Sequence, residues 1–464
     1  MKRKTENKDL LFKKFSPRII IKFQDSLNLP YNSESEIEDF LSKNEILPMK
    51  ELSKKFPGIK IKKLFTSVEP KDITKLVNKA RALNPKYQPP NFFTYCIMDC
   101  PYKTDTYKLV QEIRKSKNVE FAYVENKPAP PPGIITGSNP MNTSQGYLDP
   151  APKGINARYA WQFNGGLGEG QVKFIDIEYA WILEHEDIKN SGVRFLWGER
   201  DVSDFSDHGT SVLGIILMQD NEFGGLGITP KVKTHVVSQI NPDGDNSVYD
   251  AIVNATANLD FGDILLLEVQ ASTAGVQGDF YWPTEIEPPI FHVIELATNN
   301  GIIVIEAAGN GDSRRGSKLD NFADESGKKI LERASDDFKD SGAIIVGAAS
   351  ATNAHGKVRS SNYGNRVDCF GWGTKVFTAD DPAKDLSRPP YRDNFSETSS
   401  ASAIIAGAAI VVQSIAEASG KQRLSAIEMR DILSNPTNGT PSRNAIGIMP
   451  DLKEIIDNVI PGLR

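Results

Sequence analysis

The segment that most constrains the fold lies near the C-terminus. Residues 400–418 read SASAIIAGAAIVVQSIAEA, a run of small and apolar residues with good helix formers and no proline. This composition predicts one buried helix whose small residues let neighbouring backbones come close. Ser399 directly precedes the run, where unpaired N–H groups and the positive helix end stabilise negative charge. Taken alone, this serine would by default be interpreted as the N-cap of a core helix.

The region from residue 150 to the C-terminus alternates strand-like and helix-like segments. The strand candidates are the apolar runs at residues 172–176, 232–239, 263–270, 302–308 and 343–350. This alternation predicts an α/β fold with a mostly parallel sheet flanked by helices. Active sites in such sheets gather at the carboxyl ends of strands. Asp176 and Asn310 lie at those ends.

A proline-rich stretch divides the chain. The sequence KPAPPPG at residues 127–133 begins an extended, poorly packing segment. Before it, strand-like runs alternate with amphipathic helices, which predicts a small α+β domain. The expected organisation is therefore an α+β domain over residues 1–126, a linker over 127–149 and an α/β domain over 150–464.

Composition argues against several classes of protein. The net charge of −6 and the lack of a basic patch with interleaved aromatic residues give no reason to expect nucleic acid as a partner. The three cysteines form neither a disulfide framework nor a zinc motif. The basic N-terminus lacks the apolar core of a secretory signal, and no stretch approaches about eighteen apolar residues. We therefore expect a cytoplasmic protein with no membrane partner.

Four motifs follow one another along the second domain. They are VKFID ending at Asp176, DHGTSV containing His208, IEAAGN ending at Asn310 and ETSSASA containing Ser399. In this order they resemble the aspartate, histidine, asparagine and serine motifs of subtilisin-like serine proteases, the subtilases. The resemblance implies a serine endopeptidase that cleaves polypeptides through an acyl-enzyme and needs no cofactor for its chemistry.

The resemblance also implies a role for each of these residues. Ser399 is the nucleophile, and His208 is the base that accepts its proton. Asp176 orients the imidazole and stabilises its charged form. Asn310 and the backbone N–H of Ser399 donate hydrogen bonds to the oxyanion. No Gly-x-Ser-x-Gly elbow surrounds Ser399, which argues against an α/β-hydrolase.

Two residues depart from the nucleophile motif of the family. Glu397 replaces a glycine two residues before Ser399, and Ala403 replaces a proline in the following helix. Alanine is the better helix former, so the second change is harmless. A side chain at residue 397 can crowd the substrate, or the backbone there can demand glycine geometry. The alternative is therefore a catalytically degenerate binding protein with the subtilase fold.

The end of the first domain resembles a subtilase prodomain. Residues 118–125, NVEFAYVE, are similar to the closing strand of such prodomains. The resemblance implies that residues 1–126 act as a folding chaperone and as an intramolecular inhibitor. An accessory domain that is never removed remains the alternative.

The segment from His208 to Pro230 aligns without a gap with secreted subtilisins, and their structural calcium loop falls in it. The resemblance implies a tentative calcium site, and oxygen-only ligands of this kind suit such a hard cation. The implied ligands are the side chains of Asp187 and Asn221 and the carbonyls of Gln219, Phe223 and Gly225. Two extra residues lie between Asp187 and Asp176 compared with the family. A glycine-rich turn without metal is the alternative.

The strand that pairs with the substrate in this family usually ends in Ser-Leu-Gly. The matching residues here are Glu268, Val269 and Gln270. We expect Glu268 to bias the pocket toward polar or basic residues near the scissile bond. The alternative is that Glu268 turns into solvent or pairs elsewhere.

Overall fold

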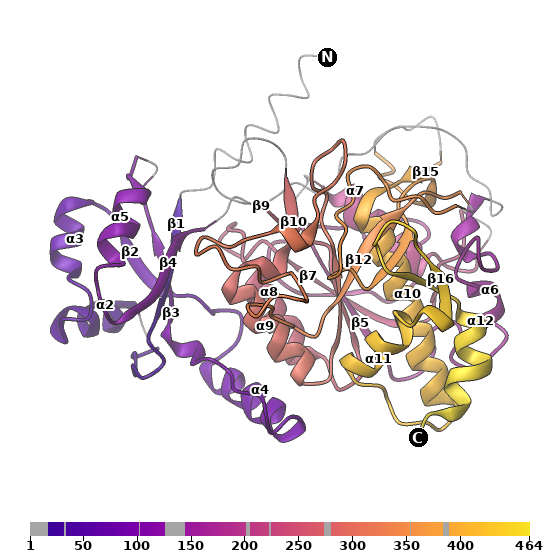
Figure 1. The fold of residues 1–464 in the computed structure, drawn as a ribbon, viewed down its shortest axis with the longest axis horizontal. Coiled ribbons are helices and arrows are strands. Elements are labelled where there is room, and N and C mark those ends of the chain that lie inside the picture. Colours follow the sequence, from indigo (N-terminus) through magenta and orange to yellow (C-terminus); the bar gives the residue numbers. More distant parts are fainter. Residues whose placement is uncertain are drawn as a thin grey trace, which may run out of the picture. The chain divides into compact units, whose positions relative to one another are not determined.

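The computed structural model divides the chain into two compact units, one of residues 1–78 with 86–127 and one of residues 79–85 with 128–464 (Figure 1). The structure describes residues 17–31, 34–101, 103–125, 144–200, 205–221, 224–272, 280–352, 354–383 and 389–464.

The first unit is a four-stranded antiparallel sheet with helices, as predicted for an α+β domain. The strands are β1 (Arg18–Phe23), β2 (Lys60–Lys63), β3 (Tyr95–Asp99) and β4 (Val119–Val124), in the order β2-β3-β1-β4. The helices are α2 (Glu34–Lys43), α3 (Met49–Lys55), α5 (Thr106–Ile113) and the first part, up to residue 78, of α4 (Pro70–Leu83). The predicted amphipathic helix α5 begins at Asp105, whose side chain caps it, and it buries Leu109 and Ile113.

The second unit is built on a nine-stranded sheet in the order β16-β17-β13-β12-β11-β8-β5-β7-β6. Its strands are β5 (Lys173–Glu178), β6 (Arg194–Trp197), β7 (Lys233–Ser238), β8 (Ile264–Leu267), β11 (Ile303–Ala307), β12 (Ile344–Ala349), β13 (Cys369–Trp372), β16 (Gly439–Pro441) and β17 (Ile448–Pro450). All neighbours pair in parallel except β16 and β17. The predicted α/β class with a mostly parallel sheet is confirmed.

Helices flank this sheet (Figure 1). The longer ones are α7 (Ser206–Leu217), α8 (Val248–Asn258), α9 (Pro288–Asn299), α10 (Glu397–Ala418) and α11 (Ala426–Leu433), and α6 (Ala157–Ala160) and α12 (Leu452–Glu454) are short. Helix α10 packs against α7 and against β11, β12 and β13, while α8 and α9 pack on each other. Two small antiparallel pairs complete the unit: β9 (Gln270–Ser272) with β10 (Tyr281–Pro283), and β14 (Val376–Ala379) with β15 (Tyr391–Phe395).

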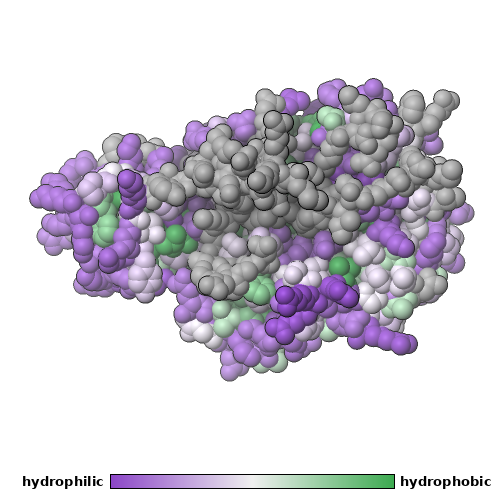
Figure 2. Space-filling model, turned by 90° about the horizontal axis from the view of Figure 1, so that it is seen from above, coloured by the Kyte–Doolittle hydropathy of each residue, from purple (hydrophilic) through white to green (hydrophobic). Residues whose placement is uncertain are grey.

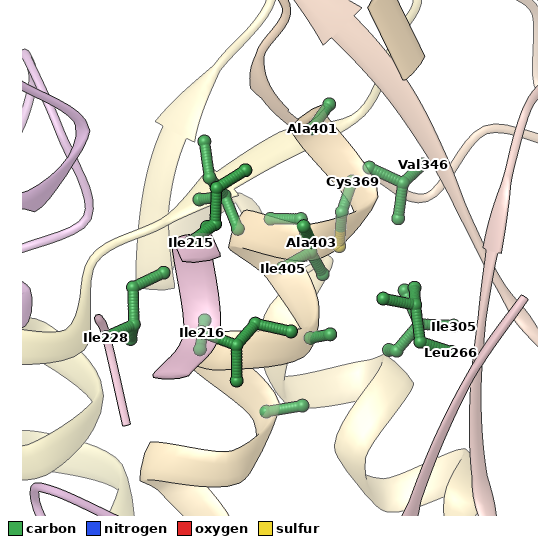
Figure 3. Close-up of a cluster of buried hydrophobic side chains, with 14 of the residues drawn as sticks. Ile215, Ile216, Ile228, Leu266, Ile305, Val346, Cys369, Ala401, Ala403 and Ile405 are labelled. Atoms are coloured by element: carbon green, nitrogen blue, oxygen red, sulfur yellow. The ribbon is translucent and has the colours of Figure 1, made fainter. Parts of the chain in front are cut away.

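Helix α10 is the central element that its sequence predicts. Every residue from Thr398 to Ala416 is buried. Figure 3 shows it between α7 and the sheet, with Ala403 and Ile405 facing Ile215 on one side and Val346 on the other. Small residues are needed because neighbours come close, and a Cβ on Gly407 would lie 2.7 Å from Ile228.

Among the described residues, α10 is the one helix that is long and apolar enough to cross a membrane. This differs from the expectation that no stretch of the sequence approaches the length of a membrane span. Its apolar window is 100 % buried inside the fold, so its composition is explained by the protein core. Figure 2 shows a mainly hydrophilic surface on the face it displays. Among the described residues, the exposed large apolar side chains are Leu83, Tyr107 and Ile427.

The second unit begins earlier than the predicted linker allows. Tyr147 and Leu148 are fully buried in its core. Gln145 donates to the Tyr147 hydroxyl and to the Leu226 carbonyl, at 2.8 and 2.9 Å. The linker predicted over residues 127–149 therefore ends before Gln145, while residues 127–143 lie outside the described part of the chain.

Candidate active site

Two helix N-termini carry the predicted nucleophile and base. His208 is the third residue of α7, and Ser399 is the third residue of α10. Both are buried, with exposed fractions of 1 % and 3 %. Ser396 is the N-cap of α10 but makes no side-chain capping bond. Other residues bind first-turn N–H groups of α10 in its place: Glu397 N–H donates to the Gly373 carbonyl at 2.9 Å, and Thr398 N–H donates to Asn310 Oδ1 at 3.3 Å.

The carboxyl group that contacts His208 belongs to Glu178. Its Oε1 lies 2.5 Å from His208 Nδ1, and both side chains are buried. Asp176, predicted for this role, instead accepts a hydrogen bond from Trp181 Nε1 at 2.8 Å. Side chains two apart on a strand share a face, so both acids of β5 face the same way. Glu178 ends the strand and has the longer side chain, so it takes the place expected for Asp176.

The sequence contained a signal for Glu178 that the motif match to Asp176 hid. Measured from Asp176, two extra residues precede Asp187 relative to the family. Measured from Glu178, the excess disappears, because Glu178 lies two residues further along the chain. The spacing to Asp187 was therefore better evidence than the identity of the acidic residue.

Three buried carboxyl groups surround the imidazole and the serine: Asp176, Glu178 and Glu268. Burial raises the pKa of Asp176 well above its usual range, the charge of Glu178 adds to this, and the Trp181 hydrogen bond opposes it. Burial also raises the pKa of Glu178, against a hydrogen bond from the Tyr179 backbone. Glu268 follows the same pattern, with burial as the largest cause and Glu178 as the next. Such shifts are typical of functional sites.

Glu268 does not lie where a substrate side chain would meet it. It is 6 % exposed, and its Oε1 lies 2.6 Å from the Ser402 hydroxyl inside the fold. The contact with Ser402 matches the alternative expectation, in which Glu268 pairs with another residue of the protein. Val269 and Gln270, the other two residues expected in the substrate pocket, are 7 % and 8 % exposed.

Asn310 is held between two elements. Its Oδ1 accepts from the Thr398 hydroxyl at 3.1 Å and from the Thr398 N–H at 3.3 Å. Its Nδ2 donates to Gln270 Oε1 over 3.3 Å, and its backbone N–H donates to the same oxygen at 3.0 Å. The side-chain amide is thus fixed beside the first turn of α10. The Nδ2 bond is long, and a better acceptor can replace it.

The helices α7 and α10, which carry the base and the nucleophile, pack on each other, but no hydrogen bond joins His208 Nε2 to Ser399 Oγ in the described structure. Catalytic hydrogen bonds are often long or absent without substrate and tighten when it binds. The Phe395 ring meets the imidazole edge to face, with 5.3 Å between the ring centres. Phe395 thereby restricts the orientation of the imidazole.

Glu397 occupies backbone geometry that favours glycine. Its φ of 73° lies in the left-handed region, which is unfavourable for a residue with a side chain. The carboxyl accepts a hydrogen bond from Ser360, and Lys357 lies near enough to act on its charge. Burial raises the pKa of Glu397, and the Ser360 bond opposes this. The expectation of glycine geometry at this position agrees with the observed φ, and the side chain is fixed on Ser360.

The implied calcium ligands come together only in part. Asn221 Nδ2 donates to Asp187 Oδ1 at 2.6 Å, and the Gln219 backbone N–H donates to the Asp187 carbonyl at 3.2 Å. The Gln219 side chain donates to two other backbone carbonyls. Gly225 closes the loop beside Asp187, and its backbone N–H acts on that carboxyl. Phe223 lies outside the described residues.

One oxygen of the Asp187 carboxyl group has no direct hydrogen bond in the described structure. This oxygen, Oδ2, is buried, and the nearby Tyr391 hydroxyl donates to Glu186 and also acts on the Asp187 carboxyl. Burial raises the pKa of Asp187 to about 6, against the Asn221 hydrogen bond. A side chain at Gly224 would clash with this carboxyl. The described residues hold no cluster of three His, Cys, Asp or Glu, so a cation here would depend on amide and carbonyl oxygens, which fit calcium.

Comparison with known sequences identifies the family. The profile of the Subtilase family matches residues 183–447, which include His208, Asn310 and Ser399 but begin after β5. The Major intracellular serine protease of Bacillus subtilis (strain 168) is 23 % identical over 303 residues, covering 64 % of this chain and 83 % of its own. The Intracellular serine protease of Paenibacillus polymyxa is 24 % identical over 306 residues, covering 64 % and 82 %.

Comparison with solved structures supports the fold. The crystal structure of fervidolysin from Fervidobacterium pennivorans, described as a keratinolytic enzyme related to subtilisin, matches with a TM-score of 0.54 and 12 % identity. The match covers 97 % of this chain and 62 % of that one. Since the family profile spans more than half of the chain, the chain belongs to the subtilase family and is a subtilisin-like serine endopeptidase.

Proposed function

We propose that the protein cleaves peptide bonds with a Glu178–His208–Ser399 triad. The observation that carries this proposal is the 2.5 Å contact between Glu178 Oε1 and His208 Nδ1. A carboxylate at Nδ1 fixes the tautomer in which Nε2 accepts a proton. Glutamate supplies the same charge as aspartate from one carbon further away. The role expected for Asp176 thus passes to Glu178.

In this mechanism, Ser399 Oγ attacks the scissile carbonyl while His208 Nε2 takes its proton. The imidazolium then protonates the departing amine, and Glu178 stabilises its positive charge. A water molecule repeats the sequence to release the acyl group from Ser399. Asn310 Nδ2 and the Ser399 N–H would donate to the oxyanion, and losing one such donor typically costs about 3 kcal/mol of transition-state stabilisation.

The polypeptide substrate would extend beside Val269 and Gln270, next to the oxyanion donors. Gln270 supports this placement because its Oε1 already holds Asn310 Nδ2 and releases it when an oxyanion forms. Cleavage of a peptide library by wild type and Val269→Ala tests the position of this pocket. A changed side-chain preference near the scissile bond is expected, and an identical profile places the substrate elsewhere.

A fluorophosphonate probe, which reacts with activated serines, tests the proposal and separates it from the binding-protein alternative. We expect the wild type to be labelled and to hydrolyse casein, and Ser399→Ala to do neither. Absence of labelling in wild type freed of its first unit would favour the degenerate protein. The hydrogen bond from Ser360 to Glu397 supports the enzyme, because it holds that side chain in place.

We also propose that residues 1–126 act as an intramolecular chaperone and inhibitor. The support is the prodomain-like closing strand, which forms β4 at the edge of an antiparallel sheet. N-terminal sequencing of purified wild type and Ser399→Ala tests this. A shortened wild type beside a full-length variant is expected. Full-length, fully active wild type would instead indicate an accessory domain.

A structural calcium ion is proposed for the loop around Asp187, with Asn221 rotating its amide oxygen toward the ion. The buried Oδ2 without a donor supports this. Calcium would rigidify the loop and take no part in the chemistry. EGTA should lower the Tm of the wild type and leave that of Asp187→Asn unchanged. If EGTA changes the Tm of both proteins equally, the loop is a glycine-rich turn that binds no metal.

A cytoplasmic location is proposed because two relatives carry "intracellular" in their names. Fractionation of the source cells followed by immunodetection tests it. Recovery of the protein outside the cytoplasm would overturn it.

A further inference from the structure

The catalytic centre holds more acid than a triad uses. Asp176 and Glu178 come from β5, and Glu268 follows the end of β8, which pairs with β5. All three side chains are buried, and Glu268 Oε2 has no hydrogen bond in the described structure. Three neighbouring carboxylates without a buried cation would repel one another strongly. Protons must therefore be shared unequally among them.

The contacts of Ser402 can accommodate a proton on Glu268. Its Oγ is 2.6 Å from Glu268 Oε1, 2.8 Å from the Thr398 carbonyl and 3.1 Å from the Ser399 carbonyl. A hydroxyl has one hydrogen to donate and two lone pairs that accept. Ser402 can give its hydrogen either to an ionised Glu268 or to the Thr398 carbonyl, and in the second case a protonated Glu268 donates to Ser402 Oγ. The burial of Glu268 beside two other acids favours the second arrangement.

We propose that Glu268 is a positioning residue of the active site that works in its protonated form, donating to Ser402 in the first turns of α10 and adding no charge of its own beside Ser399. This inference rests on the proposed triad. It assigns Glu268 to the catalytic centre and not to substrate selection. The neutral carboxyl anchors the helix turn that presents Ser399 without adding a charge that would oppose the oxyanion.

The surroundings of Glu268 are consistent with this role. Burial raises its pKa well above the usual range, Glu178 and Asp176 raise it further, and the hydroxyl groups of Ser402 and Ser399 act in the opposite direction. Helix α7 contributes His208 and Asp207, and β11 contributes Glu306, whose charge interacts with Glu285 and Arg366. Burial and the neighbouring acids therefore favour the neutral form of Glu268, and the two serine hydroxyls oppose them.

The pH dependence of kcat/KM tests the proposal. Once Glu268 ionises, wild-type kcat/KM should fall by about tenfold per pH unit on the alkaline side. Glu268→Gln keeps an N–H donor for Ser402 and cannot ionise, so this alkaline fall should disappear. Glu268→Asp remains titratable and should keep it. The same alkaline fall in Glu268→Gln and wild type overturns the proposal.

Ser402→Ala tests the position of the proton directly. If Glu268 donates to Ser402, removing the acceptor makes the neutral acid less favourable, and the alkaline fall moves to lower pH. If Ser402 donates to Glu268, the fall moves to higher pH, and the proposal is wrong.

Thermal unfolding provides a readout that does not need activity. Because the pKa of Glu268 is raised in the folded state, its contribution to stability is complete below its unfolded pKa of about 4.3 and is lost as pH rises through its folded pKa. The Tm of Glu268→Gln relative to wild type should therefore increase with pH. A constant difference contradicts a buried neutral acid. If the wild type is inactive but the Tm difference still increases with pH, the proposed protease function is wrong and the proposal of a protonated Glu268 is supported.

Discussion

Two groups of buried acidic side chains differ in how their charges are paired. The first, the acidic centre, consists of Asp176, Glu178 and Glu268. The second, the arginine cluster, consists of Arg366, Glu285 and Asp368. In the arginine cluster the guanidinium is 0 % exposed and binds both acids. In the acidic centre the basic partner is the imidazole of His208, which contacts Glu178.

The contacts of Arg366 account for nearly all of its donors. It donates to both oxygens of Glu285, at 2.8 and 3.0 Å, and to Asp368 at 2.9 Å. It also reaches the Ala343 carbonyl at 3.2 Å. A fully paired buried charge of this kind fixes one packing arrangement and has no acid or base to offer. The arginine cluster is therefore structural.

The carboxyl groups of the acidic centre instead have too few basic partners to balance their charges, which is unfavourable for folding. Such groups persist where their proton affinity is used. The comparison teaches that incomplete charge pairing, more than the number of buried acids, distinguishes the reactive site from the scaffold. The predictions below remove one member of each group in turn.

The largest effect should come from Glu178→Gln, which removes the charge at His208 Nδ1. We expect kcat/KM for a peptide substrate to fall by about 10³–10⁴, as for loss of the orienting acid in serine proteases generally. The Tm should change little, because the amide still fills the site. A loss of less than tenfold would show that Glu178 is not the triad acid.

Arg366→Met should have the next largest effect, and it should fall on stability. Leaving Glu285 and Asp368 buried without their partner costs about 3–5 kcal/mol of unfolding free energy. Urea unfolding measures it. Arg315→Met is the matched control, since the Arg315 side chain is 85 % exposed and its loss should change stability by less than about 0.5 kcal/mol. Equal effects in both variants would remove the distinction between the two acid groups.

Asp176→Asn should have the smallest effect, although the sequence motif assigns this residue to the triad. Its Oδ2 accepts from Trp181, and an asparagine oxygen can do the same. Burial raises the pKa of Asp176, and its neighbour Glu178 is the acid that contacts the imidazole. We expect kcat/KM to fall by less than about tenfold, or about 1.4 kcal/mol. A loss as large as that of Glu178→Gln would restore Asp176 to the triad.

The sequence predicts well what depends on periodicity and composition. The buried helix α10, the parallel strands and the α+β character of the first unit all follow from patterns of apolar residues. His208, Asn310 and Ser399 are proposed from sequence motifs, and the structure places the Asn310 side chain beside Thr398 in the first turn of α10.

The sequence does not predict which of several nearby side chains makes a particular contact in the folded protein. Asp176 and Glu178 share a face of β5, and only the position of α7 decides which of them meets the imidazole. Glu268 matches the expected position along the chain, but its side chain turns inward to Ser402. Leu148 appeared to belong to a linker because the prolines before it dominate the local composition, yet it packs in the core.

Proton NMR of the hydrogen between His208 Nδ1 and its carboxyl partner tests the central claim most directly. Such a hydrogen, held in a short, charge-assisted bond, gives a strongly downfield signal. The signal should be present in wild type and in Asp176→Asn, and absent in Glu178→Gln. A signal that survives in Glu178→Gln and vanishes in Asp176→Asn would contradict the account.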